Sequence, residues 1–305
     1  MNPDAVVVGQ LARDLVLLID DMPDAGSATD VRLRREMLGG KGANQAVALA
    51  QLGVRPALVA VCGTDLAGDE LLAQAGRDGL DVSHVVRRAD APTGLIVEVL
   101  DGGAHWRYLQ HLPGPMLLTA ADVDRAADLL RSTRAVLVQL QQPSEAVLAA
   151  AHHGRAGDAL VVLDGVPEKK SDRTALLALA DVWRADDQEA ELLTGVPGGD
   201  PDRLRAAARE LLDAGPGLVA LGLPDGNLFA WDDPRWGTGD ALLPLTDEKV
   251  VDTTGGGDAF TAALTAALLR GDSPESAARE AVAASGVTVR HPGGRPDLSG
   301  SRRTS

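Results

Sequence analysis

A segment near the C-terminus of the 305-residue chain, Asp252–Asp258, reads DTTGGGD and stands directly before an apolar stretch with helical spacing. Glycine has no Cβ, so successive backbone N–H groups can converge on one ligand. The N-terminus of a helix adds unpaired N–H donors and a partial positive charge. We interpret Gly255, Gly256 and Gly257 as an anion hole, and Asp258 as a base that accepts a proton from a hydroxyl attacking the bound anion. The alternative is a glycine-rich turn in which Asp258 only caps the helix.

A second glycine-rich segment, Gly39–Ala46 (GGKGANQA), also precedes a predicted helix. It carries three polar side chains, those of Lys41, Asn44 and Gln45. The amide of Asn44 can both donate and accept hydrogen bonds, which suits a sugar hydroxyl. The alternative is again a tight turn followed by a helix N-cap.

Several other kinds of site are excluded by motif and by charge. The only Gly-Lys pair, Gly40-Lys41, is followed by Gly42, so the chain has no P-loop, and the GxGxxG, HExxH and CxxC patterns are also missing. The formal net charge of −15 argues against a nucleic-acid partner, because phosphate backbones need a basic face.

The composition also predicts where the protein works. No apolar run approaches the ~20 residues that span a bilayer, so we expect no membrane association. The single cysteine, Cys62, excludes a disulfide within the chain, and no apolar segment of signal-peptide type follows basic residues at the start. We therefore expect a cytoplasmic protein.

The two glycine-rich segments need a scaffold that holds them together. Short apolar runs alternate with stretches of helical spacing, which predicts an α/β fold with a doubly wound, mostly parallel sheet and helices on both faces. The expected strands are Ala5–Gly9, Ala57–Cys62, Ala135–Leu140, Leu160–Asp164 and Leu218–Gly222. The expected helices are Gly42–Leu52, Leu66–Asp78, Thr119–Leu130, Ser144–His153, Pro201–Ala214, Gly257–Leu269 and Pro274–Val289.

Two segments break this alternation, residues 14–37 and residues 93–111. The second reads as two extended runs joined by Asp101-Gly102-Gly103, which is a hairpin signal. We predict that both segments form a small β-sheet appended to a single α/β domain, residues 1–298. We expect the polar tail 299–305 to be disordered.

The two glycine-rich segments together resemble the two signatures of the ribokinase-like (PfkB) carbohydrate kinases. Gly39–Ala46 is similar to the first signature, and Asp252–Phe260 is similar to the second, D-T-x-G-A-G-D-x-F. Gly63–Gly68 matches G-x-D-x-x-G, and Glu189–Gly195 resembles the family's E-A-E-x-L-T-G helix. The resemblance covers nearly the whole chain.

The resemblance implies an ATP-dependent sugar kinase with Asp258 as the catalytic base, and with D-ribose as the leading acceptor. The γ-phosphate would rest on the N–H groups of Gly255, Gly256 and Gly257. It also implies that the sugar is bound by Asp14, Gly40, Lys41, Asn44 and Gln141. The nucleotide would be bound by Asp186, Gly222 and Gly226, and Glu189 would hold Mg²⁺ through water. Many members of the family are activated by K⁺, which would be held here at Asp252, Thr254 and Gly293. In the family the small β-sheet is a lid that covers the sugar and forms a homodimer contact.

The chain departs from the family pattern at several positions. Ala12 stands in place of an Asn, Gln141 in place of a Glu, Asp186 in place of an Asn, and Ala220 in place of a Thr. The changed sugar ligands can redirect specificity, so another pentose, a ketose, a sugar acid or a nucleoside stays open as the acceptor. Two readings of other classes also stay open. One is a sugar- or nucleotide-binding regulator with weak catalysis. The other is a dehydrogenase-type nucleotide domain, although the first strand lacks its glycine fingerprint.

Overall fold

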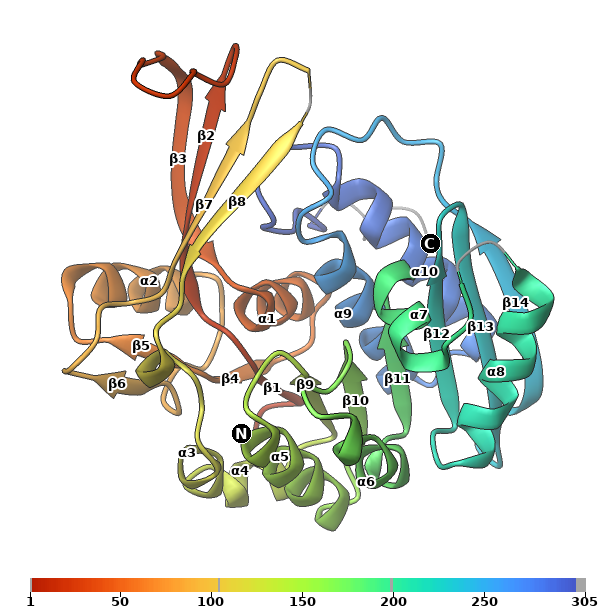
Figure 1. The fold of residues 1–305 in the computed structure, drawn as a ribbon. Coiled ribbons are helices and arrows are strands. Elements are labelled where there is room, and N and C mark those ends of the chain that lie inside the picture. Colours follow the sequence, from red (N-terminus) through yellow and green to blue (C-terminus); the bar gives the residue numbers. More distant parts are fainter. Residues whose placement is uncertain (1, 104, 198–199, 300–305) are drawn as a thin grey trace.

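The main sheet of the protein has eight strands in the order β14-β13-β12-β11-β10-β9-β1-β4 (Figure 1). The computed structural model describes residues 2–103, 105–197 and 200–299. The six strands from β12 to β4 run parallel, and β13 and β14 complete one edge as an antiparallel hairpin. The strand bounds are β1 Ala5–Val8, β4 Pro56–Val59, β9 Ala135–Gln139, β10 Leu160–Asp164, β11 Val182–Ala185, β12 Leu218–Leu223, β13 Gly226–Asp233 and β14 Gly237–Pro244.

Helices cover both faces of this sheet, which confirms the predicted doubly wound α/β class. One face carries α1 (Lys41–Gln51), α2 (Leu66–Arg77), α9 (Gly256–Arg270) and α10 (Pro274–Thr288). The other carries α3 (Ala120–Asp124), α4 (Ala127–Arg131), α5 (Ser144–Ala156), α6 (Arg173–Leu179), α7 (Asp187–Thr194) and α8 (Pro201–Asp213). Two 3-10 helices, η1 (Gly114–Met116) and η2 (Lys170–Asp172), lie in the connections.

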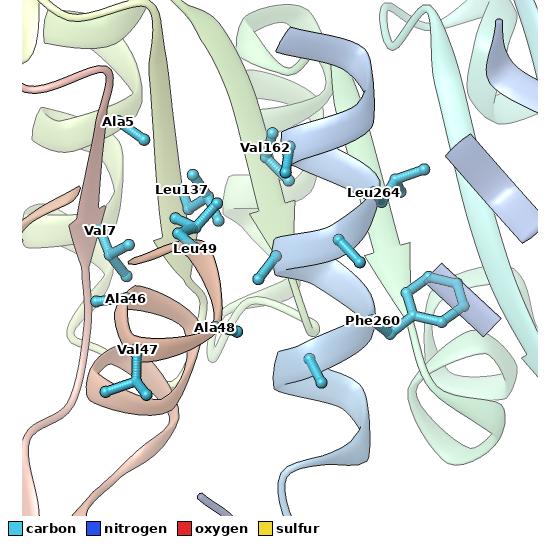
Figure 2. Close-up of a cluster of buried hydrophobic side chains, with 14 of the residues drawn as sticks. Ala5, Val7, Ala46, Val47, Ala48, Leu49, Leu137, Val162, Phe260 and Leu264 are labelled. Atoms are coloured by element: carbon cyan, nitrogen blue, oxygen red, sulfur yellow. The ribbon is translucent and has the colours of Figure 1, made fainter. Parts of the chain in front are cut away.

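A hydrophobic core lies on each face of the main sheet, and successive residues of the central strands contribute to the two cores in alternation. Val7 belongs to the core under α1 and α9, whereas its neighbours Val6 and Val8 belong to the core under α3–α8. Both sides of such a strand are buried, which is why β1 reads AVVV without polar interruption. Figure 2 shows Leu49 of α1 and Leu264 of α9 in the same apolar cluster over the sheet. Small alanines on both helices let them approach closely, and this packing fixes the N-termini of α1 and α9 relative to each other.

The helix predicted from Thr119 to about Leu130 is instead two short helices, α3 and α4. Thr119 does cap the first one, in a capping box with Asp122. The chain then leaves helical geometry at Ala126, whose backbone angles are φ −98° and ψ 10°. The segment after Asp225, for which the sequence analysis names no strand, forms the β13–β14 hairpin at the sheet edge.

A separate four-stranded sheet rises from one end of the main sheet (Figure 1). Its strands are β2 (Ala12–Ile19), β3 (Val31–Gly39), β7 (Leu95–Leu100) and β8 (Trp106–His111), in the order β3-β2-β7-β8. We call this sheet the lid. Strands β2 and β3 are inserted between β1 and α1, so β3 ends where α1 begins, whereas β7 and β8 follow β6 later in the chain. A third, two-stranded sheet pairs β5 (Val61–Gly63) with β6 (Val86–Arg88).

Candidate active site

A cavity of about 610 Å³ lies between the lid and the N-termini of α1, α7 and α9. Parallel α/β sheets bind their ligands at this position, outside the carboxyl ends of the strands. Of the residues predicted from the sequence, ten line the cavity: Asp14, Gly40, Lys41, Asn44, Gln141, Asp186, Thr254, Gly255, Gly257 and Asp258. The other six, Gly222, Gly226, Glu189, Asp252, Gly256 and Gly293, lie behind or beside this lining.

The N-terminus of α9 presents unpaired N–H groups to the cavity. Gly255 precedes the helix with φ 73°, and a Cβ there would lie 1.8 Å from the carbonyl oxygen of Gly294, so only glycine fits. No acceptor in the described part of the chain takes the N–H of Gly255, Gly257 or Asp258. The N–H of Gly256 is directed instead to the carbonyl of Thr253, at 3.4 Å. The donors available to an anion are therefore not the three glycines expected, because Asp258 replaces Gly256 in the set.

Asp258 is buried and hydrogen-bonded to helix α1. Asn44 Nδ2 donates to its Oδ2 at 3.2 Å, and Gln45 Nε2 donates to its Oδ1 at 3.3 Å. Burial raises the pKa of Asp258 to about 7, and Asp164 adds to the rise, while Lys41 and the two amide hydrogen bonds oppose it. The two glycine-rich segments thus meet, and the carboxylate between them can exchange a proton near neutral pH.

Arg184, which sequence reasoning missed, stands against this helix start. It lies on β11 directly opposite Asp164 of β10, and its Nη1 is 3.0 Å from Asp164 Oδ1 and 3.7 Å from Glu189 Oε2. A Cβ built on Gly257 would lie 2.7 Å from Arg184 Nη2. The two carboxylates outweigh burial and raise the pKa of the guanidinium, which therefore stays charged. A single charge inside the apolar strand VWRA was the available signal.

The departure at Ala220 makes room for Arg184. Ala220 is the register partner of Arg184 on β12 and is 1% exposed. A small side chain there leaves space for the guanidinium, whose Cζ lies 5.7 Å from the ring centroid of Phe260. Ala220, which stands in place of the family's Thr, is therefore part of the packing around a buried cation.

The N-terminus of α7 carries the acidic residues expected near the nucleotide. Asp186 caps the helix and accepts from the N–H of Glu189 at 2.8 Å, while Glu189 Oε2 accepts from the N–H of Asp186 at 3.0 Å. Burial and Asp164 raise the pKa of Glu189, and Lys41, 3.8 Å away, opposes this. Gly222 packs on the backbone of Asp187, where a Cβ would come within 2.5 Å, and Gly226 opens β13 after the turn.

These carboxylates fit a magnesium ion only as outer ligands. Glu189 Oε1 faces Lys41 and takes no hydrogen bond among the described residues, so one oxygen can accept from a water of the ion. No group of three or more His, Cys, Asp and Glu in residues 2–103, 105–197 and 200–299 could hold a metal by itself. Mg²⁺ bound mainly by substrate phosphates suits this donor set.

The three residues expected to hold a monovalent cation are hydrogen-bonded to one another. The backbone and hydroxyl of Thr254 donate to Asp252 Oδ1 at 2.9 and 2.6 Å, and the N–H of Gly293 donates to Asp252 Oδ2 at 2.8 Å. The structure brings Asp252, Thr254 and Gly293 together, and potassium binding by them stays a prediction.

The lid contributes a polar face that sequence reasoning also missed. The strand register aligns Asp14 with Ile96, Ile96 with Gln110, and Glu98 with Tyr108, and all five line the cavity. The Tyr108 hydroxyl contacts the hydroxyl of Thr254 across the cavity mouth. Burial, followed by nearby acidic groups, raises the pKa of Asp14 to about 7 and that of Glu98 to about 8. Glu98 is the only charge in the strand LIVEVL, which was the available signal.

The cavity therefore has two ends of opposite character. The α7–α9 end carries Lys41, Arg184 and the free N–H groups, which attract an anion. The lid end carries Asp14 and Glu98, with Gln141 on the wall, where it accepts from Gln139 Nε2 at 3.3 Å. Asp258 stands between the two ends. This arrangement can hold a phosphate at one end and a hydroxyl-bearing molecule at the other.

Comparison with known proteins agrees with this geometry. A model of the pfkB family of carbohydrate kinases matches residues 2–299. A deoxyribokinase of Salmonella typhi is 27% identical over 92% of this chain and 90% of its own length, and a ribokinase of Haemophilus influenzae is 28% identical over 98% and 96%. The structure of Arabidopsis thaliana ribokinase complexed with ribose and ATP superposes with a TM-score of 0.82, at 26% identity, over the full length of both chains. No helix of the described residues has the length and apolar character to cross a membrane.

Proposed function

We propose that this chain, which belongs to the pfkB family of carbohydrate kinases, transfers the γ-phosphate of ATP to a hydroxyl of a small sugar. D-Ribose is the leading candidate for that sugar. A phosphotransferase acting on a sugar hydroxyl is what the family shares. The choice of ribose is supported by the relatives named above and by the first glycine-rich segment. The low identity to these relatives leaves room for a different acceptor.

One observation carries the reaction type: a buried carboxylate, Asp258, stands at the start of α9 beside unpaired N–H groups. In the proposed reaction a sugar hydroxyl approaches Asp258, which takes its proton as the oxygen attacks the γ-phosphorus. The bond from phosphorus to the bridging oxygen of ADP breaks on the opposite side. Negative charge on the transferring oxygens is met by the N–H groups of Gly255 and Gly257.

Arg184 and Lys41 extend this electrostatic support. Both are cavity-lining cations at the anion end, and both are held in place by Glu189. The Arg184 side chain is 13% exposed and that of Lys41 35%, so the charge of Arg184 is the less screened by water and acts the more strongly. Magnesium bound to the phosphates would neutralise further charge, with Glu189 and Asp186 accepting hydrogen bonds from its waters.

The acceptor is bound at the lid end in this proposal. Asp14, Asn44 and Gln141 supply oxygen and nitrogen atoms suited to sugar hydroxyls, and the backbone of Gly40 lies beside them. The phosphates of ATP run toward Asp186 and the turn between β12 and β13. We further propose that two copies of the chain pair through the lid and that the protein works in the cytoplasm, where ATP is supplied.

The test is an ADP-release screen over pentoses, hexoses, sugar acids and nucleosides, run in sodium and in potassium buffers, with the Asp258→Asn variant alongside. The proposal expects at least one sugar to give turnover in the wild type that the variant lacks. If the wild type releases ADP no faster than the variant with every acceptor, the protein is a binding regulator on this fold and the kinase proposal fails.

A further inference from the structure

The face of the lid that closes the cavity carries two carboxylates on neighbouring strands. Asp14 is on β2 and Glu98 is on β7, and their side chains are 2% and 3% exposed. In the parallel register Glu98 stands opposite Val16, two residues along from Asp14, so both carboxylates lie on the same face of the sheet. Both line the cavity.

The buried side-chain atoms of the cavity lining that lack a partner are all acceptors. Within the described residues they are Asp14 Oδ1, Asn44 Oδ1 and Glu98 Oε2. Buried acceptors without a donor cost free energy, and proteins keep them where a ligand supplies the donor. These free acceptors at the lid end of the cavity are therefore suited to a ligand rich in N–H or O–H groups.

The acidic groups at this end also lack a cationic partner within the described residues. None of the ion pairs in the described part of the chain involves Asp14 or Glu98. The cations of the cavity, Lys41 and Arg184, are paired with Glu189 and Asp164 at the opposite end. Glu98 interacts on the lid side with Tyr108, Thr254 and the carboxyl groups of Asp14 and Asp252, and none of these four is a cation.

We propose that the acceptor of this kinase is a sugar that carries a protonated amine, and that the amine is bound between Glu98 and Asp14. An ammonium group supplies up to three donors and a positive charge, so it satisfies both free carboxylate oxygens at once. A neutral hydroxyl supplies one donor and no positive charge. A sugar acid would bring a third carboxylate to this end and is disfavoured.

This inference rests on the proposed kinase function and refines its substrate class. Glu98 is the residue that would set the preference, because Asp14 is also suited to the neutral hydroxyls of any sugar. The hydroxyl that receives the phosphate lies toward Asp258, and the amine lies at the far side of the sugar, under the lid.

The experiment compares matched pairs of amine and parent sugar: D-glucosamine with D-glucose, D-galactosamine with D-galactose, and fructosamine with D-fructose. D-Ribose and D-gluconate complete the set. Binding is measured by titration calorimetry in the presence of a non-hydrolysable ATP analogue and Mg²⁺, and turnover is measured by ADP release. The proteins are the wild type, Glu98→Gln, Glu98→Met and Glu36→Gln. Glu36 is the control because it lies on the outer face of the same lid and pairs there with Arg13 and Arg34.

At least one amine should bind the wild type roughly tenfold or more tightly than its parent sugar, because a buried charge pair is lost when the amine is missing. Glu98→Gln and Glu98→Met should bring this ratio close to one, and Glu36→Gln should leave it unchanged. The inference is wrong if every parent sugar binds as tightly as its amine, if D-gluconate binds best, or if the preference survives in both Glu98 variants. Absence of ADP release with every sugar would instead contradict the kinase function, while the calorimetric ratios would still report on the amine.

Discussion

The side-chain amide of Asn44 donates a hydrogen bond to the carboxylate of Asp258, with 3.2 Å between the two atoms and 214 positions of sequence between the residues. This bond ties the N-terminus of α1 to that of α9. The residue that we propose binds the acceptor is therefore hydrogen-bonded to the residue that we propose takes its proton.

Asp258→Asn keeps the shape of the side chain and removes the base. We expect kcat to fall by roughly 10²–10⁴-fold, the usual contribution of a positioned base, with a small change in KM for the sugar. The measurement is ADP release under saturating ATP. Asp202→Asn serves as the control, because Asp202 is exposed on α8 and takes no part in the site. Wild-type turnover in Asp258→Asn would show that another group accepts the proton.

The stability of the protein should fall as pH rises toward neutrality. The fold raises the pKa of Asp14 and of Asp258 from 3.8 to about 7, so the folded state holds these protons more tightly than the unfolded state. Their contribution to the free energy of unfolding is present below about pH 4 and is lost as pH rises through about 7. Glu98, with a pKa of about 8, extends the same trend upward.

Thermal denaturation across this pH range checks the sign. Asp258→Asn removes one of the three groups, so its Tm should gain on that of the wild type as pH rises from about 5 to about 8. Parallel Tm curves for the two proteins would show that Asp258 does not titrate in this window. For activity the dependence is opposite, because the base must be ionised: kcat/KM should rise with pH toward about 7.

Replacing Arg184 should affect both stability and turnover, and the two effects can be separated. Arg184→Gln leaves Asp164 and Glu189 as buried carboxylates without their cation, a cost of about 3–5 kcal/mol. The double variant Arg184→Gln with Asp164→Asn removes one of those charges and keeps an acceptor for Gln45, which donates to Asp164 at 2.7 Å. We expect the double variant to recover most of the Tm but to keep a roughly 10²-fold loss in kcat. Recovery of kcat together with Tm would assign Arg184 a purely structural role.

Substitution by alanine should have different effects on activity and stability at Gly255 and at Gly256, the two glycines where α9 begins. Gly255→Ala forces a positive φ on a residue with a Cβ, a strain of about 1–3 kcal/mol, and drives that Cβ against the carbonyl of Gly294. Gly256→Ala meets only the side chains of Val289 and Ser285, at 2.9 and 3.0 Å, which can move slightly. We expect Gly255→Ala to lose most activity and several degrees of Tm, and Gly256→Ala to stay close to wild type in both. A larger loss in Gly256→Ala would contradict this geometry.

The features found from the sequence were the ones encoded locally. Glycines before an apolar stretch predict where a helix begins, so the starts of α1 and α9 were predicted to within one residue. Alternating strands and helices likewise predicted the parallel sheet. The break at Ala126 was not visible, because nothing in its local sequence forbids a continuous helix.

The features that were missed depend on which residues face each other across strands. Glu98 and Tyr108 reach the cavity only because β7 pairs with β2 and β8 in a particular register, and a slip of one residue would turn both outward. The position of Arg184 in the site could not be predicted either, because its partner Asp164 lies on a neighbouring strand. The hydrogen bond from the backbone N–H of Gly293 to Asp252 was likewise not predicted, because the two residues are far apart in the sequence.

The lid is built from two insertions, β2–β3 between β1 and α1 and β7–β8 after β6, so its residues lie on a sheet separate from the main one. The phosphate-handling parts, on α9, α7 and β11, belong to the packed sheet and can accept few changes. The residues that face the far side of the sugar belong to a peripheral sheet with its own register. Substitution of a few lid residues, such as Glu98 and Gln110, can therefore change which sugar is accepted without changing the residues proposed to transfer the phosphate.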